Sequence, residues 1–254
     1  MSDFYSRQDF HLNRELISPQ KILVVGCGAI GRNVASMIGR LGPSKIVVID
    51  HDTIDDVNIS PQNFLRQHIG HSKCEVVCEE IQQQLSEDSE TSVISINERW
   101  TPALHAKDKN LSDITTVFCC VDSIETRKTL FEYVFSNTTA SYFFDVRIGG
   151  FLAQIFSVNF DNLEMNPEFD ENGNTANELE CWYQSTLFSP KETASFGCVQ
   201  PMSNYVANIA SGTAVNQYSN TLNGRPTAKL LEYETVFCSM TKINDEQEIA
   251  EKFK

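Results

Sequence analysis

The sequence predicts an α/β protein whose mostly parallel, doubly wound sheet is extended by antiparallel strands in the C-terminal part. Short apolar runs alternate with stretches of helical periodicity over the first 146 residues, which is the pattern of consecutive β-α-β units. A glycine-rich turn joins the first apolar run to the first helical stretch. After residue 146 the alternation stops, and strand-like segments follow with one helical stretch between them.

The first β-α-β unit shows this pattern most clearly. KILVVG at 21–26 and KIVVID at 45–50 are apolar runs typical of strands buried on both faces. Between them, residues 29–41 place apolar side chains at helical spacing, until Gly42 and Pro43 end the helix.

The later elements are predicted from the same two patterns, short apolar runs for strands and helical spacing of apolar residues for helices. We expect helices over 73–85 and 124–135 and near 202–219, and strands over 92–96, 115–121, 142–146, 151–158 and 227–237. Residues 159–196 are acidic and rich in Asn and Glu, which predicts a long irregular segment. The polar residues 241–254 predict a frayed tail.

An excess of acidic residues limits the classes of partner. The 254 residues include 34 acidic and 20 basic side chains, a net charge of -14. Phosphate contacts need clustered Lys and Arg, so this balance argues against nucleic acid and against an anionic membrane surface. No apolar run approaches the roughly 18–20 residues that cross a bilayer, and the polar N-terminus is not a signal peptide. The eight cysteines lack the spacing of a disulfide scaffold, which predicts a reducing, cytoplasmic location.

The glycine-rich turn predicts a nucleotide site. GCGAIG at 26–31 fits the G-x-G-x-x-G pattern between a strand and a helix, and Asp50 ends the second strand. Glycines let phosphates approach the backbone at a helix N-terminus, and a carboxylate at the next strand end accepts hydrogen bonds from ribose hydroxyls. The motif alone leaves NAD, FAD and ATP open. It also leaves open a tight strand-to-helix turn that binds no ligand.

Further short motifs stand in a fixed order around this turn: FYSRQ at 4–8, IDHDTI at 49–54, VN at 57–58, QNF at 62–64, IGHSK at 69–73 and VDSIETR at 121–127. Together they resemble the ThiF/MoeB-type adenylyltransferases, the superfamily that includes the adenylation domains of ubiquitin-activating enzymes. The resemblance covers residues 4–158 well and 196–237 loosely. It implies a Rossmann-like fold and an ATP-dependent adenylyltransferase that uses Mg²⁺.

The resemblance also implies roles for single residues. Asp50 would hold the ATP ribose, Asn58 and Lys73 would contact phosphates, and Asp122 would hold Mg²⁺. Arg7 would reach into the partner subunit's site, which implies a homodimer. The implied nucleotide-binding residues are Gly26, Gly28, Ala29, Ile30, Gly31, Asp50, Asp52, Asn58, Gln62, Lys73, Asp122 and Ser123, and the implied catalytic residues are Arg7, Lys73, Asp122 and Cys198.

Several of these residues also have a plain structural interpretation. Lys73 would then be a solvated helix start, Asp122 the N-cap of the following helix, and Arg7 a surface charge. Arg127 is expected to order the Asp122 loop rather than touch the ligand.

The sequence departs from the family at two points. A phosphate-binding arginine of the family falls on Pro61, and Arg66 or Arg147 are candidates to replace it. The family's paired C-x-x-C zinc ligands are also missing, since Cys181 and Cys238 stand apart, so no zinc site is expected.

Cys198 precedes a predicted helix, where a thiol pKa is lowered. In parts of the family a cysteine near this point accepts the activated acyl group as a thioester or persulfide. The alternative is a small buried residue at the helix start. Five other cysteines are expected to be packing residues: Cys27, Cys74, Cys78, Cys119 and Cys120.

We therefore expect one adenylation domain over 1–254. Its parts are an N-terminal arm (1–20), a nucleotide-binding core (21–158), a crossover loop (159–197), a C-terminal helix and strand (198–240) and a tail (241–254). It would adenylate the C-terminal carboxylate of a small ubiquitin-like or sulfur-carrier protein and release pyrophosphate.

Other functions remain open. The chain could adenylate a short peptide or a carboxylate on a modified tRNA, although its acidity argues against tRNA. Pro61 favours a nucleotide-binding pseudoenzyme that acts as a dimeric regulatory partner. An NAD-dependent oxidoreductase is the weakest alternative, because no second domain or hydride-transfer acid or base is evident.

Overall fold

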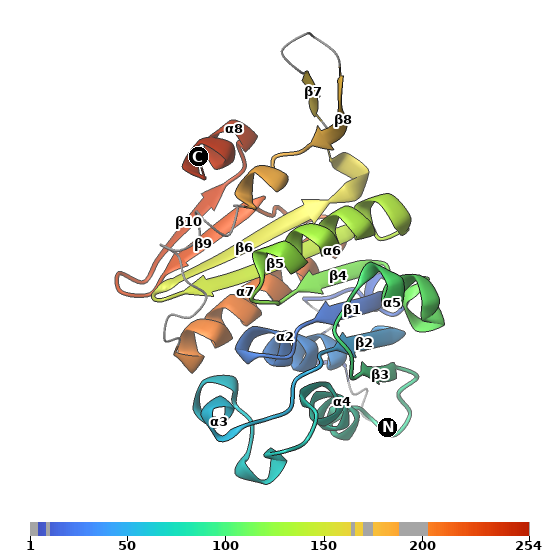
Figure 1. Cartoon of the computed structure of the whole chain (residues 1–254). Helices are drawn as coiled ribbons and strands as arrows, with labels where there is room; N and C mark the ends of the chain where they lie inside the picture. The colour runs from blue at the N-terminus through green and yellow to red at the C-terminus, as the bar shows by residue number, and fades with distance from the viewer. Residues whose placement is uncertain (1–4, 9–10, 164–165, 170–174, 188–202, 254) are drawn as a thin grey trace.

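The computed structural model describes residues 5–8, 11–163, 166–169, 175–187 and 203–253, with the backbone course alone for 166–169 and 175–180. An eight-stranded sheet crosses the molecule in the order β10-β9-β6-β5-β4-β1-β2-β3 (Figure 1). The parallel strands are β1 (Lys21–Val25), β2 (Lys45–Ile49), β3 (Ser92–Ile96), β4 (Thr116–Cys119) and β5 (Tyr142–Gly149). The antiparallel extension is β6 (Leu152–Asn159), β9 (Leu230–Glu234) and β10 (Ser239–Ile243). The predicted fold class is therefore confirmed.

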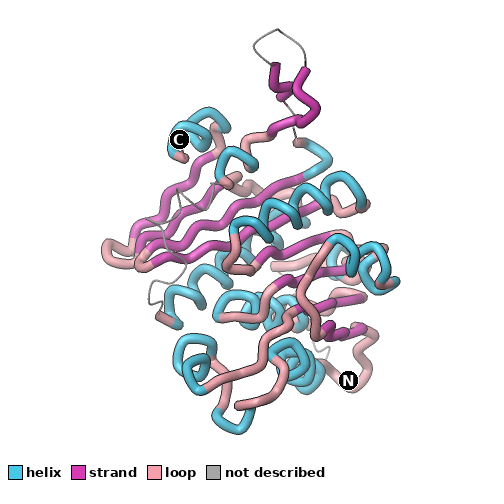
Figure 2. The backbone as a smooth tube through the Cα atoms, viewed as in Figure 1, coloured by secondary structure: helices cyan, strands magenta, loops and turns pink. Residues whose placement is uncertain are grey.

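Helices cover both faces of this sheet (Figure 2). One face packs against α2 (Ala29–Gly39), α4 (Lys73–Gln84) and α7 (Asn204–Leu222), and the other against α5 (Pro102–Lys107), α6 (Ile124–Asn137) and α8 (Glu246–Lys252). In β1, Ile22 and Val24 belong to the first core, whereas Leu23 and Val25 belong to the second. Burial on both faces explains why β1 and β2 are continuous apolar runs after their first lysine.

Two expectations about the C-terminal part are wrong. The segment expected to be irregular contains a two-stranded hairpin of β7 (Asn166–Phe169) and β8 (Thr175–Glu180), which projects from the body (Figure 1). The tail is not frayed, because β10 and α8 lie in it. Asp245 caps α8 by accepting a hydrogen bond from the Glu248 amide at 2.9 Å, and Ile249 is fully buried.

Short helices were also missed. α1 (Arg14–Ile17) precedes the sheet, and α3 (Asp56–Gln62) lies between β2 and α4. The single strand expected over 227–237 is shorter and is followed by a turn into β10. Helices of four to seven residues are too short to show a clear period, so the sequence pattern could not mark them.

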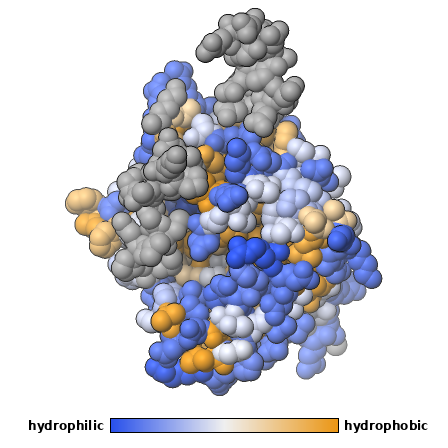
Figure 3. Space-filling view, viewed as in Figure 1, coloured by the Kyte–Doolittle hydropathy of each residue, from blue (hydrophilic) through white to orange (hydrophobic). Residues whose placement is uncertain are grey.

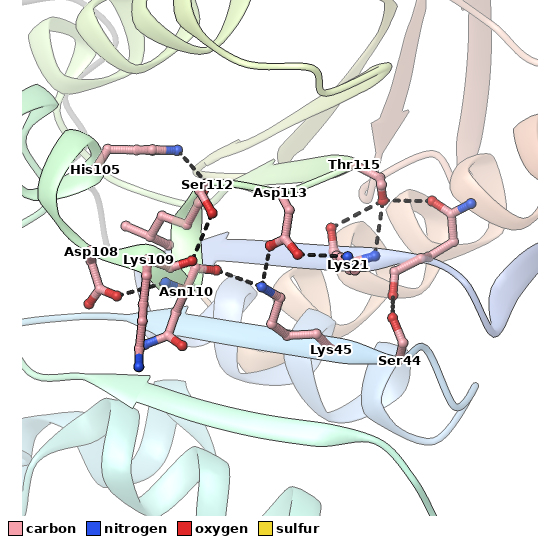
Figure 4. Close-up of polar contacts among 12 residues, drawn as sticks. Lys21, Ser44, Lys45, His105, Asp108, Lys109, Asn110, Ser112, Asp113 and Thr115 are labelled. Carbon is pink, nitrogen blue, oxygen red and sulfur yellow. Dashed lines mark hydrogen bonds and ion pairs between the residues drawn. The ribbon is translucent and has the colours of Figure 1, made fainter.

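Polar side chains close the amino-terminal edge of the parallel strands (Figure 4). Asp113 accepts a hydrogen bond from Lys21 Nζ at 2.6 Å and also contacts the Lys45 ammonium. Burial raises the pKa of Asp113, but the hydrogen bonds from Lys21 and Lys45 outweigh it, and its pKa is lowered. Thr115 accepts from the Lys21 amide at 3.0 Å. With this edge filled, the opposite, carboxyl-terminal edge is the one available for a site.

The surface agrees with the charge balance. The face shown in Figure 3 carries mostly hydrophilic residues. In the part of the chain that the structure describes, no helix is long and apolar enough to cross a bilayer.

A buried histidine gives the fold a testable pH dependence. His105 lies 4% exposed, accepts from Trp100 Nε1 at 3.3 Å through Nδ1, and donates from Nε2 to the Leu111 carbonyl at 3.0 Å. Burial lowers its pKa from the ordinary value of 6.5. The unfolded chain therefore binds the proton more readily, so this contribution to stability is present above pH 6.5 and is lost as pH falls through the lowered folded-state pKa.

We expect the free energy of unfolding, measured by urea denaturation, to fall between pH 7.5 and 5.5. His105→Gln should cost about 1–3 kcal/mol at pH 7.5 by disturbing the buried hydrogen bonds, and should flatten the dependence in this window. An equal slope in both proteins would contradict the assignment.

Candidate active site

A cavity of about 340 Å³ opens at the carboxyl-terminal edge of the parallel strands. Ten of the twelve residues expected to bind nucleotide line it: Gly26, Gly28, Ala29, Ile30, Asp50, Asp52, Gln62, Lys73, Asp122 and Ser123. Gly31 and Asn58 do not line it. The cavity lies where the strand order reverses from β1-β2-β3 to β4-β5, which is the switch point at which doubly wound sheets bind ligands.

The three glycines of the turn serve different purposes. Gly26 has φ +93°, and a Cβ there would lie 2.7 Å from the Cys120 carbonyl oxygen; a Cβ on Gly31 would lie 1.7 Å from the Gly26 oxygen. These two positions are set by backbone packing. Around Gly28, in contrast, nothing lies within 4 Å of such a Cβ, so the space above the N-cap of α2 is open. An open helix N-terminus of this kind favours an anion.

Asp50 holds the glycine turn in place. Its Oδ2 accepts a hydrogen bond from the Cys27 amide at 2.5 Å, and its Oδ1 accepts from the Asp52 amide at 2.8 Å. Sequence reasoning gave this carboxylate a role toward the ligand alone. The structure adds that it fixes the loop that would hold the ligand.

Lys73 is a buried cation at the cavity. It begins α4, is 6% exposed, and donates from Nζ to Asp52 Oδ2 at 2.9 Å. Burial raises the pKa of Asp52, but the hydrogen bond and the charge of Lys73 outweigh it, so the pKa is lowered. The interpretation of Lys73 as a solvated helix start is therefore wrong.

The turn after β4 presents Asp122 to the cavity. Ser123, not Asp122, is the N-cap of α6, since Ser123 Oγ accepts from the Thr126 amide at 3.2 Å. Asp122 is exposed and its carboxylate does not cap the helix. The Arg127 guanidinium donates to the Val121 carbonyl, so it holds this turn as the sequence analysis expected.

Sequence reasoning missed the residues that follow β3. Glu98, Arg99 and Trp100 line the cavity, and Arg99 Nη2 lies 2.8 Å from His51 Nε2. The available signal was their position just after the strand predicted over 92–96, because the carboxyl ends of parallel strands meet at one edge. Neither of the arginines proposed to replace the one at Pro61 lines the cavity. Arg66 is 79% exposed and pairs with Asp56, and Arg147 binds Thr186.

Two predicted site residues, Asn58 and Arg7, do not line the cavity. Asn58 Oδ1 accepts from the Asp55 amide at 2.9 Å and so caps α3, away from the cavity. Arg7 is exposed, in a segment whose Tyr5 ring packs 3.8 Å from the Arg14 guanidinium carbon. Arg7 does not line the cavity of its own chain. Cys198 lies outside the described residues.

The cysteines expected to be packing residues are buried: Cys27, Cys74, Cys78, Cys119 and Cys120. Burial raises the pKa of each thiol, that of Cys78 to about 12, so they are poor nucleophiles.

Within the described residues, one group of three potential metal ligands has atoms within 4.8 Å of one another: Asp50, His51 and Asp52. Their side chains already bind the Cys27 amide, Arg99 and Lys73, respectively.

Comparisons with known proteins agree with this architecture. The ubiquitin-like modifier-activating enzyme 5 of Bombyx mori is 22% identical over 197 residues, which are 75% of this chain and 42% of that protein. The NEDD8-activating enzyme E1 catalytic subunit of Caenorhabditis elegans is 38% identical over 74 residues, 29% of this chain and 17% of that protein. The chain thus spans less than half the length of these curated relatives.

A solved structure and a family model cover far more of the chain. The crystal structure of E. coli MccB with ATP matches with a TM-score of 0.71 at 17% identity, over 96% of this chain and 71% of that one. This likeness shows that the fold is shared. The model of the ThiF family matches residues 7–251. Because that match spans nearly the whole chain, the protein belongs to the ThiF family.

Proposed function

We propose that the protein is an ATP-dependent adenylyltransferase that activates the C-terminal carboxylate of a polypeptide and releases pyrophosphate. The observation that carries the proposal is the cavity itself. It combines an open helix N-terminus at Gly28, the carboxylates of Asp50 and Asp122, and the buried ammonium of Lys73. A carboxylate and an α-phosphate are both anions, so a site that joins them needs cations and oriented backbone amides.

The residues present fit ATP. The space above Gly28 admits a phosphate group, and Gln62 Oε1 is buried at the cavity without a hydrogen-bond partner. A ligand hydroxyl or bound water would satisfy that oxygen. Asp122 offers an exposed carboxylate of the kind Mg²⁺ prefers. Bound there with ATP, Mg²⁺ would neutralise phosphate charge and polarise the α-phosphate.

Two cations of this chain would then act on the nucleotide. Lys73 is held in one orientation by Asp52 and would stabilise negative charge on the phosphates. Arg99 would supply the second cation, in place of the arginine that falls on Pro61. Among the described residues, Arg99 and Arg127 are the arginines that line the cavity, and the Arg127 guanidinium is bound to Asp145.

The proposed acceptor is a small ubiquitin-like protein, as the named activating-enzyme relatives suggest, or a sulfur-carrier protein, as the resemblance described above implies. A short peptide is a second candidate, because the likeness to MccB covers 96% of this chain, and MccB has been solved in complex with N-formylated MccA. Thioester transfer to Cys198 and a homodimer in which Arg7 completes the partner's site belong to the same proposal.

The first prediction concerns nucleotide choice. Titration calorimetry should show binding of Mg·ATP that is tighter than binding of metal-free ATP, and no binding of NAD. Asp122→Ala should remove most of the difference that Mg²⁺ makes, because it removes the proposed oxygen ligand. Binding of NAD alone would overturn the proposal. Binding of Mg·ATP without pyrophosphate exchange for any carboxylate acceptor would instead support the pseudoenzyme.

The second prediction separates the two cations from the surface charge. Lys73→Met and Arg99→Met should each weaken Mg·ATP binding by about 10–100-fold, the equivalent of about 1.5–3 kcal/mol for a hydrogen bond to a charged group. Arg66→Met is the matched control, since it removes an exposed arginine outside the cavity, and should change the Kd less than twofold. An unchanged Kd for Arg99→Met would remove Arg99 from the proposed site.

A further inference from the structure

A buried carboxylate contacts Arg127, a residue that lines the candidate site. Asp145 on β5 is 0% exposed and is bound by two arginines and a tyrosine. Arg127 of α6 contacts Oδ1, while Arg147 Nε donates to Oδ2 at 2.6 Å and the Tyr183 hydroxyl donates to Oδ2 at 2.9 Å. A carboxylate withdrawn from water persists only when it is paired and hydrogen-bonded in this way.

The two arginines connect Asp145 to two different segments of the chain. Arg127 donates its second terminal nitrogen to the Val121 carbonyl, at the turn that presents Asp122 and Ser123 to the cavity. Arg147 donates to the Thr186 carbonyl at 2.9 Å and to its hydroxyl at 3.0 Å, in the turn after Cys181. Arg127 lines the cavity and Arg147 does not.

We propose that Asp145 is a positioning residue of the nucleotide site, which acts by orienting the Arg127 guanidinium so that it fixes the Asp122 turn. A planar guanidinium can bridge a carboxylate and a carbonyl with two parallel donors, whereas an ammonium cannot hold that geometry. Asp145 sets the plane of this fork, because Arg147 and Tyr183 hold its other oxygen. The inference rests on the proposed use of Mg·ATP and adds which buried group sets the position of the Asp122 carboxylate.

The experiment compares substitutions of the two arginines that bind the Asp145 carboxylate. Arg127→Lys and Arg147→Lys each keep a charged donor for Asp145 and lose the arginine's second contact. That contact is the Val121 carbonyl of the pocket turn for Arg127, and Thr186 for Arg147. The affinity for ATP is measured by calorimetry with Mg²⁺ and with EDTA, and the Tm of each variant is recorded beside it.

We expect Arg127→Lys to weaken Mg·ATP binding about tenfold and metal-free ATP binding much less, as when an outer-shell partner of a metal ligand is lost. Arg147→Lys should lower the Tm to a similar extent and leave both affinities within twofold. Equal changes of affinity in the two variants would reduce Asp145 to a stabilising role and overturn the inference.

Asp145→Asn distinguishes positioning from direct contact. If Asp145 acts through Arg127, this variant reproduces the loss of Mg²⁺ dependence seen in Arg127→Lys. Where it does not fold, Tyr183→Phe, which removes one donor to the same oxygen and keeps every charge, should show the same loss in smaller measure. Intact Mg²⁺ dependence in the folded variant would assign Arg127 to the ligand itself and overturn the role of Asp145. Absence of Mg·ATP binding by the unmodified chain would overturn the proposed function together with this inference.

Discussion

The arrangement of the whole site depends on one backbone contact, where the turn after β1 meets the end of β4. Gly26 lies so close to the Cys120 carbonyl that a Cβ would be 2.7 Å from its oxygen, and Gly31 lies against Gly26 in the same way. This approach fixes where α2 begins and where the turn carrying Asp122 emerges. Asp50 then holds the loop from the side of β2 by its bond to the Cys27 amide. The ends of three strands that are neighbours in the sheet, β4, β1 and β2, are thereby fixed relative to one another without a ligand.

Most of the fold could be predicted because its buried strands and long helices carry unambiguous periods. β3 was predicted with its observed bounds, and the N-terminal boundary of α6 at Ile124 was also correct. α8 could not be predicted from its seven residues. Its helical state depends on packing against one face of the sheet, where Ile249 joins the second core and the ring centroids of Phe253 and Phe156 lie 5.8 Å apart. Tertiary packing of this kind outweighs the polar composition that suggested a frayed tail.

The site residues divide in the same way, into those that the sequence marks and those that depend on tertiary structure. Lys73 and Asp122 were assigned a role by the resemblance of their ordered motifs to the ThiF/MoeB-type enzymes, and both line the cavity. Arg99 has no motif, and its place depends on the pairing of β3 with β2, which periodicity does not reveal. Asn58 lies on the other side of this division. The resemblance implies a phosphate contact for it, whereas in the structure its side-chain oxygen accepts from the Asp55 amide at the start of α3 and the residue does not line the cavity.

The strand order also bears on how the chain reaches its folded state. β1 lies between β2, which follows it closely, and β4, whose residues come more than 90 positions later, as the pairing of Ile22 with Thr116 shows. During synthesis one hydrogen-bonding edge of this apolar strand therefore stays open until β4 has left the ribosome. Such open edges invite pairing between chains. Parallel sheets of this kind also form slowly, because distant segments must meet first. We therefore expect the yield of folded protein to depend more on protection of the nascent β1 edge than on the stability of the finished sheet. A lower growth temperature or a greater chaperone capacity would provide that protection.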